Sequence, residues 1–351
     1  MKAKNMIVLV FCLYALINTN PFKEYTYNFT VLHENSETAK VCQLKNGDVL
    51  AISSGYSTEQ ITNMTKFDKD GHPIYEKYQL LNGFSPSSMV VESRTKATPE
   101  YYLFHHNKQK IAASSLSDQN ITTFKDKGEI IKSFNLRKRI YGKISMVPLK
   151  SGKIFLAGID TIAVQGDQTK VELNIYNPDS NKIEGGGVSF DSYGKLVSCF
   201  EQNENEIYCA HSYLVNPFVI SLSIKLLKIT SSGITIENAD SIKIVEHWYT
   251  IMNFLKAIPL SKTEAAILVQ IGVGGKNEEI PFGNSGKDLF FFHISTNGGN
   301  IEVKRMEYLS NSCTYVDDKE EFEYYNADII ALSEKRIIAV CESGDNKFQG
   351  I

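Results

Sequence analysis

The sequence predicts an all-β protein, a β-propeller of about six four-stranded blades. From Phe22 onward, the 351-residue chain shows no long helical period of apolar residues, and short apolar stretches alternate with polar turns instead. Two types of hairpin alternate along the chain, and the first recurs roughly every 50–70 residues, the length of a blade with its loops. One or two long β-sandwiches are the alternative, but sandwiches do not alternate two hairpin types at a fixed period.

The first hairpin type places a short polar turn between two apolar strands. Its clearest copies span 41–52 and 146–157, with turns at Gly47 and Gly152. Gly, Asn and Asp suit such turns because a positive φ costs them little. Further turns of this type are expected near Thr95, Glu204, Thr263 and Lys335.

The second hairpin type follows an apolar strand with an Asn, Asp or Gly turn. It is clearest at 65–75 and 122–131, and weaker copies begin at Leu173, Leu226 and Phe291. Two hairpins make one four-stranded sheet, so the alternation of the two types accounts for whole blades.

A further pattern lies in the first repeat, within 44–78. Its members are Lys66, Asp68, Gly71, Lys77 and Tyr78, with Tyr75 near the place of a usual Trp. This stretch resembles the secreted propeller repeat common in bacteria, archaea and protists, a D-G-G-y-i-i-A-G segment followed by K-x-D-x-x-G-x-x-x-W-x-K-x-Y. The stretch 146–159 is similar to the first half of that repeat. The resemblance implies an extracellular propeller with no common catalytic residues.

The last repeat reaches Ile351 after a single hairpin, which would leave the edge of an incomplete blade open. The stretch 25–32 alternates aromatic and polar residues, as a half-buried strand does. We expect this N-terminal strand to close the last blade by pairing with 337–342. The alternative is that the blade continues in chain beyond Ile351.

The N-terminus predicts a signal peptide over 1–20, followed by a single propeller domain over 21–351. Lys2 and Lys4 precede the apolar run 6–17, which is shorter than the roughly 20 residues of a spanning helix. A buried N-terminal strand or helix is the alternative. A secreted or cell-surface location follows, with no membrane span.

Three sequons accompany the predicted signal peptide. In a secreted chain they predict glycosylation, and the acceptor residues are Asn28, Asn63 and Asn120.

Five cysteines remain once Cys12 leaves with the signal peptide. Cys199 and Cys209 flank the polar turn 202–205, so a hairpin centred there places them opposite each other and predicts a disulfide. Cys313 and Cys341 form a second candidate pair that the sequence leaves open. The fifth cysteine, Cys42, has no assigned partner.

Composition and motifs exclude several kinds of chemistry. A net charge of -3 argues against a nucleic-acid partner. Asp68 and Asp70 resemble the start of a calcium loop but lack its third Asp, so we expect a plain hairpin turn and no metal. The glycines at 272–275 precede no helix, which argues against a nucleotide, and no cofactor is expected.

The sequence therefore favours a secreted or cell-surface glycoprotein that is a non-enzymatic module and binds an extracellular protein or glycan through the loops of one propeller face. The alternative is a secreted propeller enzyme, such as a glycan hydrolase or lyase, which needs ionisable groups that converge from several blades. No catalytic residue is assigned. The side chains that could converge are Glu264, Asp288, His211 and His293.

Overall fold

A computed structural model describes most of the chain, and every statement below concerns the residues that it describes. These are residues 6–12, 27–34, 36–55, 61–70, 72–82, 84–85, 90–107, 119–136, 144–165, 168–193, 197–216, 219–237, 241–242, 250–273, 287–297, 300–310, 328–333 and 336–343. Their regular structure consists of β-strands and one 3-10 turn.

The chain divides into two compact units. The first comprises Met1–Glu92, Thr98–Ser133 and Val316–Ile351, and the second comprises Ser93–Ala97 and Phe134–Tyr315. The prediction of a single domain over 21–351 is not tested by this division and stays a prediction. No helix among the described residues has the length and apolar character needed to cross a membrane.

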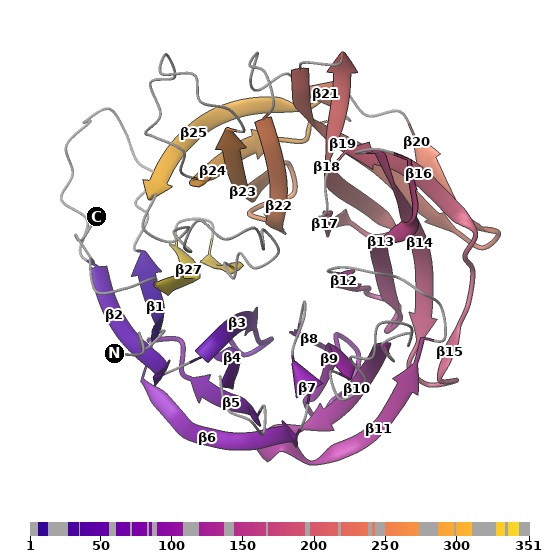
Figure 1. The fold of residues 1–351 in the computed structure, drawn as a ribbon. Helices are drawn as coiled ribbons and strands as arrows, with labels where there is room; N and C mark the ends of the chain where they lie inside the picture. The colour runs from indigo at the N-terminus through magenta and orange to yellow at the C-terminus, as the bar shows by residue number, and fades with distance from the viewer. Residues whose placement is uncertain are drawn as a thin grey trace. The chain divides into compact units, whose positions relative to one another are not determined.

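Two sheets of the first unit are each formed by one continuous stretch of chain (Figure 1). Sheet 1 has the order β3-β4-β5-β6, with bounds Ser36–Gln43, Val49–Gly55, Ile61–Phe67 and Pro73–Asn82. Sheet 2 has the order β11-β10-β9-β7, and β8 also pairs with β9. Its elements are β7 (Phe84–Ser85), β8 (Val90–Glu92), β9 (Glu100–Asn107), β10 (Gln119–Lys125), the 3-10 turn η2 (Asp126–Gly128) and β11 (Ile130–Asn135).

A terminal sheet joins both ends of the chain in the first unit. Its order is β2-β1-β27-β26, with β1 Met6–Cys12, β2 Tyr27–Glu34, β26 Asp328–Ser333 and β27 Arg336–Ser343. An N-terminal strand thus closes the last hairpin, as predicted, but the strand differs. β1 pairs directly with β27, and β2, which contains most of 25–32, lies on the far side of β1.

The physical reason for this correction is the composition of β1. Its sequence MIVLVFC is rich in β-branched and aromatic residues, which favour a strand. The same apolar composition is also typical of a signal peptide, so composition does not distinguish the two. The arrangement corresponds to the N-terminal strand that the sequence left as an alternative. Removal of 1–20 by a signal peptidase stays a prediction.

The second unit contains three sheets, each from one continuous stretch. Sheet 3 comprises β12 (Ile144–Pro148), β13 (Ile154–Gln165), β14 (Gln168–Asn177), β15 (Lys182–Ile183) and β16 (Val188–Tyr193). Sheet 4 comprises β17 (Ser198–Asn203), β18 (Glu206–Asn216), β19 (Val219–Thr230), β20 (Gly233–Glu237) and β21 (Ser241–Ile242). Sheet 5 comprises β22 (Thr250–Pro259), β23 (Glu264–Val273), β24 (Lys287–Ser295) and β25 (Glu302–Ser310).

The all-β propeller class is therefore confirmed. The turns predicted for the first hairpin type all join antiparallel neighbours: β3–β4, β8–β9, β12–β13, β17–β18, β22–β23 and β26–β27. In the described part of the chain, five sheets come from continuous stretches and the terminal sheet is composite. If the composite sheet is counted as a blade, the described sheets number six, as expected; if it is not, they number five.

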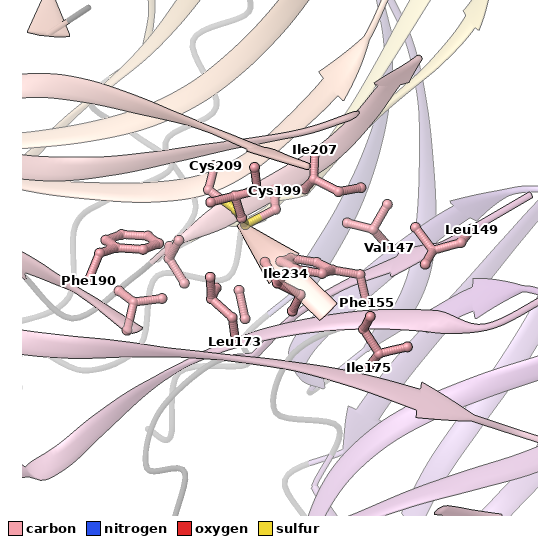
Figure 2. Close-up of a cluster of buried hydrophobic side chains, with 14 of the residues drawn as sticks. Val147, Leu149, Phe155, Leu173, Ile175, Phe190, Cys199, Ile207, Cys209 and Ile234 are labelled. Atoms are coloured by element: carbon pink, nitrogen blue, oxygen red, sulfur yellow. A yellow bond between two sulfur atoms is a disulfide. The ribbon is translucent and has the colours of Figure 1, made fainter. Parts of the chain in front are cut away.

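Apolar clusters lie where consecutive sheets face each other. Alternate residues of a strand point to opposite faces, so each sheet contributes one set of side chains to each neighbour. Between sheets 3 and 4 the cluster includes Val147, Phe155 and Leu173 on one side and Ile207 and Ile234 on the other (Figure 2). Similar clusters join sheet 1 to sheet 2 and sheet 4 to sheet 5.

Two serines tie the first strands of sheets 3, 4 and 5 together. These strands lie at sheet edges, where some backbone N–H groups lack a ladder partner. The buried hydroxyl of Ser145 accepts the N–H of Cys199 at 2.7 Å, and that of Ser198 accepts the N–H of Ala257 at 2.6 Å. Each serine thereby satisfies a buried donor of the next sheet.

Candidate functional site

Strand register places the same three positions at the turn end of successive sheets. The reference residue is the first buried apolar residue of the second strand that faces the following sheet, such as Leu50 in sheet 1. The first position, the turn position, lies two residues before this reference residue, as Asp48 does before Leu50. The second, the third-strand position, is the cross-strand partner of the reference residue, as Lys66 is of Leu50. The third, the facing position, lies near or just beyond the end of the third strand of the following sheet, as Asp126 does directly after β10.

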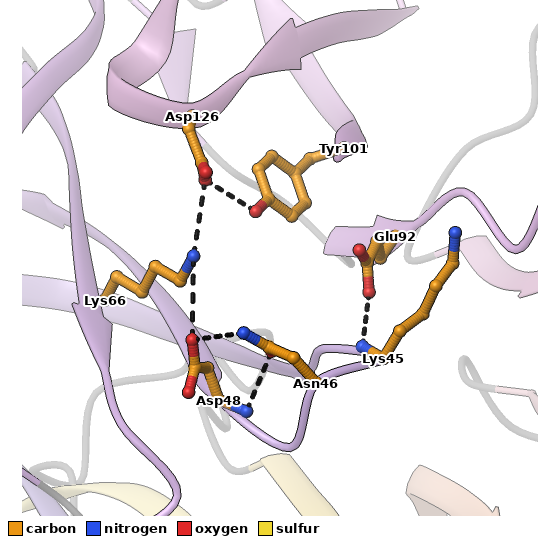
Figure 3. Close-up of polar contacts among 7 residues, drawn as sticks. All are labelled: Lys45, Asn46, Asp48, Lys66, Glu92, Tyr101 and Asp126. Atoms are coloured by element: carbon orange, nitrogen blue, oxygen red, sulfur yellow. Dashed lines mark hydrogen bonds and ion pairs between the residues drawn. The ribbon is translucent and has the colours of Figure 1, made fainter. Parts of the chain in front are cut away.

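The Lys66 cluster fills these positions between sheets 1 and 2 (Figure 3). The Lys66 ammonium lies 3.7 Å from Asp48 Oδ2 and 3.6 Å from Asp126 Oδ1. The Tyr101 hydroxyl donates to Asp126 Oδ1 at 2.7 Å, and the Asn46 amide donates to Asp48 Oδ2 at 2.6 Å. The side chains of Lys66 and Asp48 are only 10% and 14% exposed. Two carboxylates around one cation close this end of the interface.

Glu92 adds a buried carboxylate near the same turn. It accepts the backbone N–H of Lys45 at 2.6 Å (Figure 3). Burial raises the pKa of Glu92, and the Lys45 hydrogen bond opposes that shift. These contacts are all internal, so we interpret the Lys66 cluster as a structural element of the first unit.

The same positions between sheets 4 and 5 are Glu206, Leu226 and Thr296. Leu226 replaces the lysine and Thr296 replaces the second aspartate, so no ion cluster forms there. The space is a pocket of about 440 Å³, which we name the larger groove. Its lining residues are Asn203, Glu206, Tyr208, Leu226, Lys228, Glu237, Lys262, Thr263, Thr296 and Asn297.

The charges of the larger groove are balanced and partly fixed. Two glutamates and two lysines line it, and Lys228 pairs with Glu237 at 2.9 Å. The Asn203 amide donates to Glu206 Oε2 at 2.8 Å. A groove of this kind offers donors and acceptors with no net charge.

Tyr208 and Thr296 form the buried side of the larger groove. The Tyr208 hydroxyl donates to the Thr296 carbonyl at 3.4 Å. Burial raises the pKa of Tyr208, and the nearby carboxylates of Glu206 and Glu237 raise it further. The Thr296 side chain is 3% exposed, and its hydroxyl has no hydrogen-bond partner among the described residues. Buried hydroxyls are ordinarily satisfied, so this one has an unmet bond at the edge of the groove.

The smaller groove lies at the equivalent place between sheets 3 and 4. The three positions there are Lys153, Ile175 and Ile229, and the pocket measures about 250 Å³. Its lining residues are Leu149, Ser151, Lys153, Ile175, Asn205, Ile229, Thr230 and Ser231.

The predicted disulfide is present. Cys199 and Cys209 are directly opposed in β17 and β18, with Cα atoms 4.1 Å apart, and they join the cluster between sheets 3 and 4 (Figure 2). Cys42 is buried and not disulfide-bonded. Cys313 lies outside the described residues, as does the side chain of Cys341, so their pairing stays a prediction.

The other predicted sites fall on ordinary structure. Asn28 is in β2, Asn63 in β5 and Asn120 in β10, and their glycosylation stays a prediction. Asp68 Oδ1 accepts the backbone N–H groups of Asp70 and His72, each at 2.9 Å. The His72 bond leads the causes that lower the pKa of Asp68. No group of three or more metal-binding side chains occurs among the described residues.

Two of the four ionisable residues that could converge lie together. The Nε2 atom of His293 is 3.4 Å from Glu264 Oε2, because these residues occupy the third-strand and turn positions of sheet 5. His211 is fully buried in sheet 4 against the Phe190 ring, and burial lowers its pKa to about 3. Asp288 lies in β24, but its side chain is outside the described part of the structure.

Sequence reasoning missed both grooves. Each depends on which residues of consecutive sheets share a register, whereas the hairpin copies are recognisable in the sequence by their turns alone. An alignment of the copies on their strand registers would have shown Lys66 replaced by Ile175 and Leu226. That change from charged to apolar is the signal that was available.

No protein-family model matches the sequence, and no curated protein sequence does either. Solved structures do match. A protein assigned to TolB from Agrobacterium tumefaciens is 11% identical, with a TM-score of 0.51 over 98% of this chain and 100% of that chain. The likeness is one of fold.

Two further structures agree only in general architecture. The six-bladed Aleuria aurantia lectin is 11% identical, with a TM-score of 0.46 over 84% of both chains. The NanB sialidase from Streptococcus pneumoniae is 9% identical, with a TM-score of 0.43 over 95% of this chain and 71% of that one. At these values neither protein's ligand bears on the function of this chain.

Proposed function

We propose that the protein is a secreted or cell-surface, non-enzymatic binding module, and that the larger groove binds a neutral sugar residue of a glycan. The observation that carries this proposal is the open groove itself. The equivalent place between sheets 1 and 2 is filled by the Lys66 cluster, whereas here the ion cluster is replaced by Leu226 and Thr296.

The groove's chemistry suits a ligand rich in hydroxyl groups. A sugar hydroxyl both donates and accepts, so it can pair with the carboxylates, amides and ammonium groups of the lining at once. The balanced lining disfavours a highly charged ligand, and about 440 Å³ lies within the usual range of ligand pockets.

The groove is also held in shape before any ligand arrives. The Gln202 side-chain amide donates to the Ser261 carbonyl, which ties the turn of sheet 5 to sheet 4. The Lys228–Glu237 pair holds two lining side chains in place. Groups fixed in advance lose less conformational entropy on binding.

A secretory route is supported by the Cys199–Cys209 disulfide, since such bonds persist mainly in oxidising compartments. The predicted signal peptide and sequons point the same way. Secretion and glycosylation are parts of the proposal.

The test is binding of the full chain to an array of neutral glycans, followed by calorimetry on the best binder. Leu226→Lys should place an ammonium beside Glu206, as Lys66 lies beside Asp48, and should weaken binding by about tenfold or more. Leu226→Met is the matched control and should bind as the native chain does. Native affinity in Leu226→Lys would show that the larger groove is not the site.

The same samples separate binding from catalysis. The bound glycan should be recovered unchanged after long incubation, as followed by NMR. Release of a new reducing end or an unsaturated sugar would favour the alternative of a glycan hydrolase or lyase.

A further inference from the structure

We infer that the smaller groove is a second glycan subsite, specific for an acidic sugar residue that carries an apolar substituent. This inference rests on the proposed function of the larger groove. It assigns a different ligand chemistry to a different set of residues.

The first argument is a reversal of charge at one register position. The turn position is Glu206 at the larger groove and Lys153 at the smaller one. Among the described residues that line the smaller groove, Lys153 is the one with a formal charge, and the carboxylate that it contacts, Glu184, lies outside that lining. At the turn position, a ligand carboxylate would meet an ammonium in the smaller groove and the Glu206 carboxylate in the larger groove.

The second argument is that Lys153 is already oriented. Its ammonium lies 2.9 Å from Glu184 Oε2. Glu184 is itself fixed, because the Asn177 amide donates to its Oε1 at 2.7 Å and the Ser180 hydroxyl at 3.1 Å. A lysine ammonium has three N–H donors, so one contact with Glu184 leaves donors for a ligand carboxylate. Part of the conformational entropy that a long lysine side chain loses on binding is therefore already lost in the free protein.

The third argument is the division of the lining into an apolar and a hydroxyl part. Leu149 and Ile175 are 2% and 6% exposed and form an apolar floor together with Ile229. The Ser151 and Ser231 side chains supply hydroxyls, whereas the Thr230 hydroxyl already donates to the Gly233 carbonyl at 3.1 Å. An acidic sugar with an acetamido group matches this set, because it presents a carboxylate, a methyl group and several hydroxyls.

The two grooves meet at one turn of the chain. Asn203, the last residue of β17, lines the larger groove, and Asn205, in the turn that follows, lines the smaller one. Asn205 is held with φ at 64°, and its carbonyl accepts the Ile229 N–H at 2.9 Å. Two subsites lined by residues only two positions apart in the chain suit a glycan whose acidic residue neighbours a neutral one. Joint occupancy should then raise affinity through effective concentration.

The experiment titrates the full chain with three probes: methyl α-N-acetylneuraminide, methyl β-galactoside and a disaccharide of the two. The acidic probe should bind in the smaller groove, and Lys153→Gln should weaken it by about tenfold or more, the loss expected for a charge-assisted hydrogen bond. The same variant should leave the galactoside unaffected. Lys150→Gln, a turn lysine outside the lining, is the matched control and should bind all probes as the native chain does.

The outcomes separate the two proposals. Galactoside binding that Leu226→Lys weakens, together with no binding of the acidic probe, would overturn the second subsite and leave the proposed function standing. Acidic binding that Lys150→Gln and Lys153→Gln weaken equally would also overturn it, as a general charge effect. Failure of all three probes would count against both proposals.

Discussion

Sheets 1 and 2 meet across the Lys66 cluster, whereas sheets 4 and 5 meet across the larger groove, although strand register puts equivalent positions at both. In the first unit a cation and two carboxylates occupy the turn end of the interface. In the second unit the same end is open, and its core depends on apolar clusters and the Cys199–Cys209 disulfide.

The difference shows that the apolar clusters and the turn ends of the interfaces have separate roles. Each interface has its apolar cluster, so packing of consecutive sheets does not require the Lys66 cluster. The turn end can then hold an internal ion cluster or stay open, and the open end is where we propose that a ligand binds. The three predictions below test that division, beginning with the largest effect.

Replacement of both Cys199 and Cys209 by serine should lower the free energy of unfolding by about 3 kcal/mol, the chain-entropy value for so short a loop, and leave the fold intact. Reduction of the native disulfide should lower the free energy of unfolding by a similar amount. Because the bond belongs to the second unit, hydrogen exchange should rise first in β17 and β18. Equal loss of protection in sheet 1 would mean that the two units do not differ in this respect.

Lys66→Leu should lower the free energy of unfolding by about 2 kcal/mol, below the usual loss for a broken buried pair because the cluster is partly exposed. The variant leaves Asp48 and Asp126 near each other without their cation. The double variant Lys66→Leu with Asp126→Thr copies the open interface and should recover part of the loss in urea unfolding. A single variant as stable as the native chain would contradict the structural role of the Lys66 cluster.

Stability should fall in mild acid through His211. Its folded pKa of about 3 lies below the ordinary value of 6.5, so the unfolded chain takes up the proton first. The contribution of neutral His211 to the free energy of unfolding is complete above pH 6.5. It is lost as the pH falls toward 3, by about 1.4 kcal/mol for each pH unit. His211→Phe should flatten the dependence of urea unfolding on pH between 7 and 5.5. The exposed His72→Gln variant is the control and should keep the native slope.

Local patterns account for what the sequence could predict. Both hairpin types are set by residues a few positions apart, such as Gly47 and Gly152, whose φ values are +88° and +84°. The opposition of Cys199 and Cys209 follows from one turn between them. These features need no knowledge of how one sheet faces another.

Local sequence patterns cannot predict features that depend on contacts between residues far apart in the chain. The larger groove arises because Leu226 and Thr296, 70 residues apart, fall at facing positions of two sheets. The apolar run 6–17 suits both a signal peptide and a strand, and only its pairing with β27 distinguishes the second. Local propensity cannot weigh one against the other.

The hydroxyls of Ser145 and Ser198 give each edge amide a partner on a neighbouring sheet instead of within its own ladder. The exchange rates of the Cys199 and Ala257 amides should therefore depend on the separation of two sheets, rather than on the unravelling of either. Hydrogen exchange at the Cys199 amide should therefore measure transient separation of sheets 3 and 4, and exchange at the Ala257 amide that of sheets 4 and 5. The two amides report on the very interfaces that hold the two grooves, so a ligand that clamps one groove should slow exchange at one amide and spare the other.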